Sequence, residues 1–223
     1  MKKNVYDIII IGGGPTGIAL LNEHLILKKN VIVIEAIQPF NSLHNYMNNM
    51  IWHSPWRVCK LEDSEIKDVE QDKHPYVEDL IKVYTNFITK NNLSDKIIID
   101  KIKSISKNDL DYNCLNGIHN TYTCKKIIIA TGFFTHPKPL NFEIINCKNI
   151  YRFIKNYETI QNKTVVCIGG GFSSCDLSVK LQNMNNKIYI LTHSKHNVLR
   201  RFSEQINTWG QDNINHDEIN IIE

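Results

Sequence analysis

The sequence lacks the cysteine spacing of a zinc knuckle or of an adjacent redox dithiol. Its six cysteines, at positions 59, 114, 124, 147, 167 and 175, form no Cys-x-x-Cys pair, so we expect no metal site and no disulfide framework. Such usage favours a reducing compartment, and we expect a cytoplasmic protein.

Long apolar runs are also missing. No stretch approaches the roughly 18 apolar residues of a membrane span. Met1-Lys2-Lys3 and the mainly apolar residues 5–11 superficially resemble a signal peptide. The run is short and is followed by three glycines and a proline, so a buried strand explains it better.

The chain carries little excess charge of either sign. The formal net charge is +3, and 22% of the 223 residues are charged. This balance does not favour a nucleic-acid or membrane partner. A hydrophobic content of 42% is ordinary for a globular chain and allows one large domain or two small ones.

Two copies of a β-strand, glycine turn, α-helix and β-strand dominate the pattern. The first copy comprises a strand at 5–11, a helix at 15–29 and a strand at 31–34. The second comprises a strand at 165–168, a helix at 172–184 and a strand at 187–191. The βαβ unit is typical of doubly wound α/β proteins.

The region between the two copies is mixed. We expect a helix at 76–91 from its amphipathic spacing, a strand at 97–99, a small antiparallel meander at 102–124 and a buried strand at 127–130. Residues 36–75 show no regular pattern, and a loop of that length is often functional. Its densest aromatic and polar cluster is Trp52, His53, Ser54 and Trp56, for which loop packing is the simpler explanation.

The first glycine turn has the form G-x-G-x-x-G, with Gly12, Gly14 and Gly17. Gly12 permits the tight turn, Gly14 allows a pyrophosphate to approach the backbone, and Gly17 lets helix and strand pack closely. Pro15 suits the first helical turn. Glu35 ends the next strand, where a carboxylate can accept hydrogen bonds from ribose hydroxyls. The alternative is a glycine turn of an unrelated α/β protein.

An apolar strand followed by Ala130, Thr131 and Gly132, and then by Pro137 and Pro139, resembles a signature of two-dinucleotide flavoproteins. Together with the first turn and Glu35, the chain resembles pyridine nucleotide-disulfide oxidoreductases. This resemblance includes thioredoxin-reductase-like, flavin-monooxygenase-like and, most closely, bacillithiol-disulfide-reductase-like enzymes.

The resemblance implies a Rossmann-like FAD-binding domain at 1–158, with a parallel sheet and a small antiparallel meander. A partial second Rossmann-like NAD(P)-binding domain would occupy 159–223. It implies that Ala130, Thr131 and Gly132 lie beside FAD and that the backbone at Ile102 meets the adenine. Thr16 would also contact FAD, at a position where close relatives have cysteine.

The second glycine turn repeats this logic with Gly169 and Gly171, and Ser174 replaces the third glycine. Phe172 and Ser173 open the following helix, and we expect them to contact the second dinucleotide. The next strand ends without a carboxylate. Basic residues follow instead: His193, Lys195, Arg200 and Arg201, together with Ser194.

Basic groups at this position favour a 2′-phosphate, and hence NADPH over NADH. They resemble, loosely, the His-Arg-Arg element of NADPH-dependent relatives. A solvated basic turn without a ligand is the alternative.

Three functions remain open. The first is an FAD-dependent NAD(P)H oxidoreductase with an unknown small-molecule or thiol/disulfide acceptor. The second is a flavin-dependent monooxygenase, and the third is a non-catalytic dinucleotide-binding remnant. The resemblance also implies a returning C-terminal strand with a Gly-Asp turn, which we do not find. We therefore expect a C-terminally truncated or shortened homologue that is a poor catalyst and forms a homo-oligomer.

Overall fold

The chain forms two compact units. The structure is a computed structural model, and it describes residues 5–61, 69–134, 149–209 and 218–223. Unit 1 comprises residues 1–45, 57–69 and 78–150, and unit 2 comprises residues 46–56, 70–77 and 151–223. The division predicted from the sequence, 1–158 and 159–223, follows chain order, whereas the compact units interleave.

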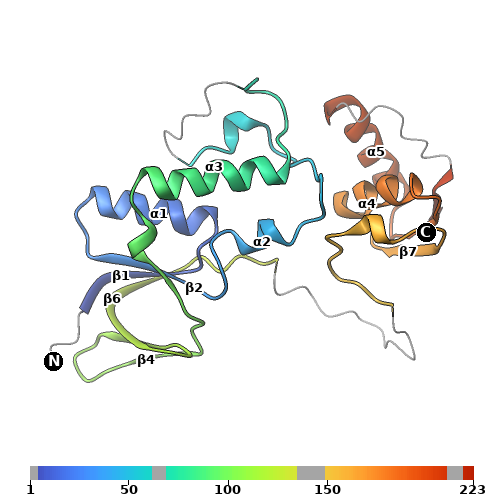
Figure 1. Cartoon of the computed structure of the whole chain (residues 1–223). Helices are drawn as coiled ribbons and strands as arrows, with labels where there is room; N and C mark the ends of the chain where they lie inside the picture. The colour runs from blue at the N-terminus through green and yellow to red at the C-terminus, as the bar shows by residue number, and fades with distance from the viewer. Residues whose placement is uncertain (1–4, 62–68, 135–148, 210–217) are drawn as a thin grey trace. The chain divides into compact units, whose positions relative to one another are not determined.

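Unit 1 is built on the predicted βαβ unit. Strand β1 (Val5–Ile11), helix α1 (Pro15–Ile26) and strand β2 (Val31–Glu35) follow each other as expected, and β1 pairs with β2 in parallel. Helix α1 packs against both strands (Figure 1). It ends three residues earlier than predicted, because Lys28 adopts a left-handed conformation with φ 55°.

The sheet of unit 1 has six strands in the order β3-β2-β1-β6-β5-β4. Strand β3 (Ile97–Ile99) pairs in parallel with β2, and β4 (Ser104–Lys107), β5 (Asn113–Asn116) and β6 (Thr121–Ile129) form an antiparallel meander. The fold class is therefore confirmed.

Strand β6 corrects one detail of the prediction. The sequence indicated a meander ending at residue 124 and a separate strand at 127–130. One continuous strand is observed, which pairs antiparallel with β5 and parallel with β1 from Val5↔Thr123 to Ile11↔Ile129. The meander is thus directly continuous with the strand that leads to Ala130.

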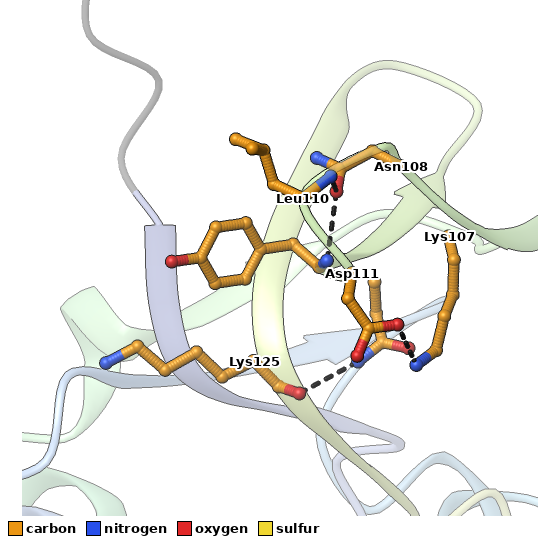
Figure 2. A network of polar contacts seen from close by, with 7 residues as sticks. Lys107, Asn108, Leu110, Asp111 and Lys125 are labelled. Atoms are coloured by element: carbon orange, nitrogen blue, oxygen red, sulfur yellow. Dashed lines mark hydrogen bonds and ion pairs between the residues drawn. The ribbon is translucent and has the colours of Figure 1, made fainter.

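The turn between β4 and β5 is closed by polar contacts (Figure 2). The Asn108 side-chain oxygen accepts hydrogen bonds from the amides of Leu110 and Tyr112 at 3.1 and 2.9 Å. Lys107 forms an ion pair with Asp111 across the turn, and Asp111 has a φ of 60°. Asn residues commonly stabilise turns in this way.

The remaining helices of the 36–96 region are α2 (Asn41–His44), η1 (Trp56–Val58), α3 (Val77–Lys90) and η2 (Ser94–Lys96). Helix α3 confirms the predicted amphipathic helix. Its Leu80, Tyr84 and Phe87 are buried, at the spacing of one helical face. The sheet core gathers the buried residues Ile9, Ile32, Ile34, Leu115, Tyr122 and Cys124.

Unit 2 contains the second βαβ unit. Its elements are η3 (Tyr157–Thr159), β7 (Thr164–Ile168), α4 (Phe172–Gln182), β8 (Lys187–Leu191), α5 (Lys195–Trp209) and β9 (Asn220–Ile222). The strands form a parallel sheet in the order β7-β8-β9. Helix α5 and strand β9 were not predicted, and α5 packs against α4 and β9.

Two segments from the irregular region join unit 2. Residues 46–56 and 70–77 are tied to each other by hydrogen bonds from Trp52 N to Pro75 O (2.7 Å), from Trp56 N to Lys73 O (2.9 Å) and from Val77 N to Met50 O (2.9 Å). Part of the predicted long loop is therefore paired, residues 50–56 with residues 73–77.

Among the described helices, none combines the length and apolar character that crossing a membrane requires.

Candidate dinucleotide-binding sites

The first glycine turn connects β1 to α1. At two of its glycines, any side chain would collide with the protein's own backbone. Gly12 has a φ of 111°, and an added Cβ would lie 2.7 Å from the carbonyl carbon of Ala130. A Cβ on Gly17 would lie 3.1 Å from the carbonyl carbon of Gly12 and even closer to its oxygen. Glycine at both positions permits close backbone packing.

Gly14 differs from these two, because a Cβ there would meet no protein atom within 4 Å. Gly14 is the N-cap of α1, has a φ of −73° and makes no side-chain capping hydrogen bond. Helix α1 therefore begins without a capping side chain, at a residue whose own side-chain position is open. A phosphate fits such a helix end.

Glu35 lies at the end of β2, beside the turn. Its Oε2 accepts a hydrogen bond from Gly13 N at 2.6 Å, and its Oε1 accepts one from Ile37 N at 3.0 Å. These bonds fix the carboxylate next to the turn. Each carboxylate oxygen can accept a further hydrogen bond, so ribose hydroxyls remain compatible with Glu35.

Residues Ala130 and Thr131 also lie at the first turn. Ala130 N donates to Ile11 O at 2.8 Å, and the missing side chain of Gly12 faces the backbone of both residues. Gly132 has a φ of 66° and open space beside its Cα. Pro137 and Pro139 lie outside the described residues. Ala130 and Thr131 thus contact the first turn, and the position of the three residues beside FAD stays a prediction.

A shallow hollow adjoins the start of α1. It is lined by Pro15, Thr16, Ala19, Leu20, Val58, Cys59, Lys60, Leu61 and Tyr84. Thr16 is exposed, so its hydroxyl is accessible from this side of the turn. Ile102 is partly buried against the sheet core, and its contact with an adenine stays a prediction.

The second glycine turn connects β7 to α4 with similar geometry. Gly169 has a φ of 98°, and a Cβ on Gly169 or on Gly171 would meet nothing within 4 Å. Gly171 is the N-cap of α4 with a φ of −74° and no side-chain capping hydrogen bond. Ser173 and Ser174 follow in the first turn of α4, and Ser174 N donates to Gly171 O at 3.0 Å.

Phe172, the first residue of α4, is contacted by two side chains. The ring of His53 meets it edge-on, with 4.7 Å between centroids. The guanidinium of Arg201 lies 5.5 Å from the same ring centroid, and its Nη1 donates to Gly170 O. Burial, followed by the nearby His74, lowers the pKa of His53. The neutral ring is therefore favoured in this aromatic contact.

The predicted basic residues cluster at the start of α5. His193 and Lys195 are exposed, and Ser194 Oγ accepts a hydrogen bond from Asn197 N at 3.3 Å, as a helix-capping side chain does. Arg200 is exposed and forms an ion pair with Glu204 at 3.0 Å, one helical turn away. Among the described contacts of the predicted set, the hydrogen bond to the glycine turn comes from Arg201.

The aromatic cluster of the irregular segment belongs to unit 2. Trp52 meets the ring of Tyr46 edge-on at 5.7 Å, and the carbonyl of Trp52 contacts His74 Nδ1 at 2.9 Å. Trp56 is buried, and Ser54 is half-buried. These contacts are packing interactions, and His53 is the member that contacts Phe172, directly after the second glycine turn. Sequence reasoning did not identify His53 with the second turn, because the contact joins residues far apart in the chain.

The described cysteines are free and mostly buried. Burial raises the pKa of Cys59 and Cys124 to about 11 and of Cys175 to about 12. Burial also raises that of Cys167. The thiolate form is disfavoured at neutral pH in all four. Cys167 and Cys175 are buried in unit 2. Among the described side chains, no cluster of three or more His, Cys, Asp or Glu could hold a metal ion.

Comparisons with known proteins agree with this architecture. Bacilliredoxin reductase Bdr from Bacillus subtilis (strain 168) is 24% identical over 201 residues, covering 90% of this chain and 60% of the relative. Ferredoxin–NADP reductase 1 from Lysinibacillus sphaericus (strain C3-41) is 26% identical over 200 residues, covering 87% and 52%. The chain thus spans little more than half the length of these relatives.

A solved structure, the bacillithiol disulfide reductase Bdr from Staphylococcus aureus, superposes with a TM-score of 0.83 at 21% identity. The match covers all of this chain and 67% of that one. The family model described as pyridine nucleotide-disulphide oxidoreductase matches residues 9–223. The chain therefore belongs to the pyridine nucleotide-disulphide oxidoreductase family.

Proposed function

We propose that this chain binds FAD at the first glycine turn and NADPH at the second, as part of an NADPH-dependent flavoprotein oxidoreductase. The observation that carries the proposal is shared by both turns. Each helix begins at a glycine, Gly14 or Gly171, that no protein contact requires. Each helix also starts without a side-chain cap. A bound pyrophosphate explains both features.

The residues present fit two dinucleotides in different ways. At the first turn, Glu35 presents a fixed carboxylate to ribose hydroxyls. At the second, α5 begins at Lys195, directly after His193 and Ser194, and the charge of Lys195 together with the helix N-terminus favours a 2′-phosphate. NADPH is therefore the proposed donor.

When bound, the nicotinamide supplies a hydride and the flavin accepts it. The described residues of the chain bind and orient the two nucleotides. The four cysteines with raised pKa give no support for an internal dithiol relay. We propose a small-molecule or thiol/disulfide acceptor that receives electrons directly from the flavin.

The free state of the five described cysteines supports a reducing compartment. We propose the cytoplasm.

A pair of substitutions tests the two sites separately. Gly14→Val and Gly171→Val add a side chain where the protein leaves space, so both variants should fold. Gly14→Val should lose flavin absorbance, and Gly171→Val should keep flavin but weaken NADPH binding at least about a hundredfold. The measurements are the flavin spectrum of the purified protein, cofactor mass spectrometry and calorimetric titration with NADPH.

Circular dichroism of each variant is the control for folding. A folded Gly14→Val protein with a full complement of FAD would refute the first assignment. Unchanged NADPH affinity in folded Gly171→Val would refute the second. Anaerobic titration of the wild-type chain with NADPH then measures flavin reduction.

A further inference from the structure

Arg201 differs from the other basic residues near the second turn, because it contacts the turn itself. Its Nη1 donates to Gly170 O, and its guanidinium lies over the ring of Phe172. Lys195 and Arg200 are exposed, whereas Arg201 is half-buried. The guanidinium is therefore engaged by protein groups on one side of the turn.

The first turn has a counterpart of the hydrogen bond between Arg201 and Gly170 O. Gly13 occupies in the first turn the position of Gly170 in the second, midway between the positive-φ glycine and the N-cap glycine. Gly13 O accepts a hydrogen bond from the backbone amide of Phe40 at 2.9 Å. The same carbonyl in the second turn receives its bond from Arg201. The equivalent carbonyl oxygens of Gly13 and Gly170 thus accept hydrogen bonds from a backbone amide and from a guanidinium, respectively.

The surroundings of Gly170 support this equivalence. A Cβ on Gly170 would lie 2.6 Å from Thr192 Oγ1 and still closer to Val198, so α5 packs directly against the turn. Arg201 is on the same helix as Val198, three residues later. His53 meets the other contact of Arg201, the Phe172 ring, at 4.7 Å. The turn, α5 and residues 46–56 therefore converge on Gly170 and Phe172.

We infer that Arg201 is a positioning residue that fixes the second glycine turn for either nicotinamide nucleotide, and that it does not bind the 2′-phosphate. The inference rests on the proposed function of the second turn, and it differs from the sequence-based expectation that Arg201 selects NADPH. Selection is then left to the exposed groups at the start of α5, including Lys195.

Substitution of Arg201 should affect both nucleotides equally, whereas substitution of Lys195 should affect NADPH alone. Arg201→Ala leaves Gly170 O without its donor, so affinity for NADPH and for NADH should fall by the same factor, about tenfold. Lys195→Ala removes a charge near the proposed phosphate and should weaken NADPH about tenfold while sparing NADH. The measurement is calorimetric titration of the full chain with both nucleotides.

Two further probes isolate the phosphate. Adenosine 2′,5′-bisphosphate and 5′-AMP differ by that group alone, and Arg201→Ala should weaken both equally. Arg201→Lys retains a positive charge and a hydrogen-bond donor. It serves as the second variant if Arg201→Ala fails to fold. The lysine variant should keep the wild-type ratio of NADPH to NADH affinity. A selective loss of NADPH or of the bisphosphate in either variant would overturn the inference.

A readout without nucleotide separates this inference from the proposed function. In the NMR spectrum, Arg201→Ala should shift the amide signals of Gly171 and Phe172, whereas Arg200→Ala, a matched exposed control, should not. Unshifted amides would overturn the positioning role even if nucleotides bind. If the wild-type chain binds neither nucleotide but these amides shift, the proposed function fails and the positioning of the turn stands.

Discussion

The two glycine turns of this chain share a backbone path but are held by different chemistry. Gly12 and Gly169 both have positive φ, and Gly14 and Gly171 are both extended N-caps. At the first turn, the carboxylate of Glu35 accepts from Gly13 N. At the second, the guanidinium of Arg201 donates to Gly170 O. The amide of Gly13 thus pairs with an anion, whereas the carbonyl of Gly170 pairs with a cation.

This difference has a consequence for ligand selection. A carboxylate beside the first turn suits a ribose with free hydroxyls and repels an additional phosphate. The second turn has no carboxylate at the end of its β8 strand, where Leu191, Thr192 and His193 follow one another. On the proposed function, the two copies of this unit accept different dinucleotides because the first ends its second strand in Glu35 and the second ends its second strand without a carboxylate.

The turns also differ in how closely they pack. Gly12 faces the backbone of Ala130, whereas Gly169 faces open space. Gly12→Ala therefore combines a positive φ with a backbone collision and should lower the unfolding free energy of unit 1 by about 3 kcal/mol or more. Gly169→Ala carries only the cost of positive φ, about 1–2 kcal/mol.

Urea unfolding followed by NMR signals from each unit measures both effects. Equal losses in the two variants would show that the collision of the added Cβ with Ala130 is relieved without cost and would contradict the prediction.

The third glycine position gives a smaller contrast. Gly17 packs onto the carbonyl of Gly12, whereas Ser174 occupies the equivalent position in α4. Gly17→Ser should destabilise unit 1 by about 2 kcal/mol through overpacking against backbone. The reciprocal change, Ser174→Gly, should cost about 0.5–1 kcal/mol through helix propensity alone. Thermal unfolding of both variants checks this order, and a stabilised Gly17→Ser protein would contradict it.

Local patterns explain what the sequence could predict. The two turns, the strands beside them and the position of Glu35 at a strand end could be predicted, because each depends on residues close in the sequence. Strands β3 and β8 were found at their predicted bounds. Short apolar runs that end in glycine or polar residues specify such elements without tertiary information.

Non-local contacts explain what the sequence missed. Among the α5 side chains that the structure describes, the buried ones are Val198, Phe202 and Gln205, and this spacing was the available but weak helical signal. The position of His53 depends on its contact with Phe172, 119 positions later in the chain. The role of Arg201 could not be inferred, because a sequence does not distinguish a guanidinium that contacts a carbonyl from one that contacts a phosphate.

The two units also anchor their loops with side chains of different charge. In unit 1, buried Asp100 accepts hydrogen bonds from the amides of Ile118 and Asn120 at 2.8 and 3.1 Å and from Tyr122 Oη at 2.9 Å. In unit 2, buried Asn186 accepts from Lys163 N at 2.9 Å and donates to Ile160 O and Leu181 O. One anchor can be protonated and the other cannot.

This contrast predicts a small acid sensitivity that is larger in unit 1 than in unit 2. Burial opposes ionisation of Asp100, but the bonds from Tyr122 and from three backbone amides outweigh it and lower its pKa below the ordinary 3.8. A lowered folded pKa adds stability at neutral pH, and that stability is lost as the pH falls below about 4. Asp100→Asn should therefore make the unfolding free energy less dependent on pH. The reduction in slope should correspond to the uptake of roughly one proton at most on unfolding.

Urea unfolding at pH 7, 5 and 3, with NMR signals assigned to each unit, measures this slope. The amides of Ile118 and Asn120 report on unit 1, and that of Lys163 reports on unit 2. In the wild-type chain, acid should weaken the first group more than the second, because no charge is lost at Asn186. An Asp100→Asn variant whose unit 1 keeps the full wild-type slope would show that other carboxylates, and not this anchor, carry the acid response.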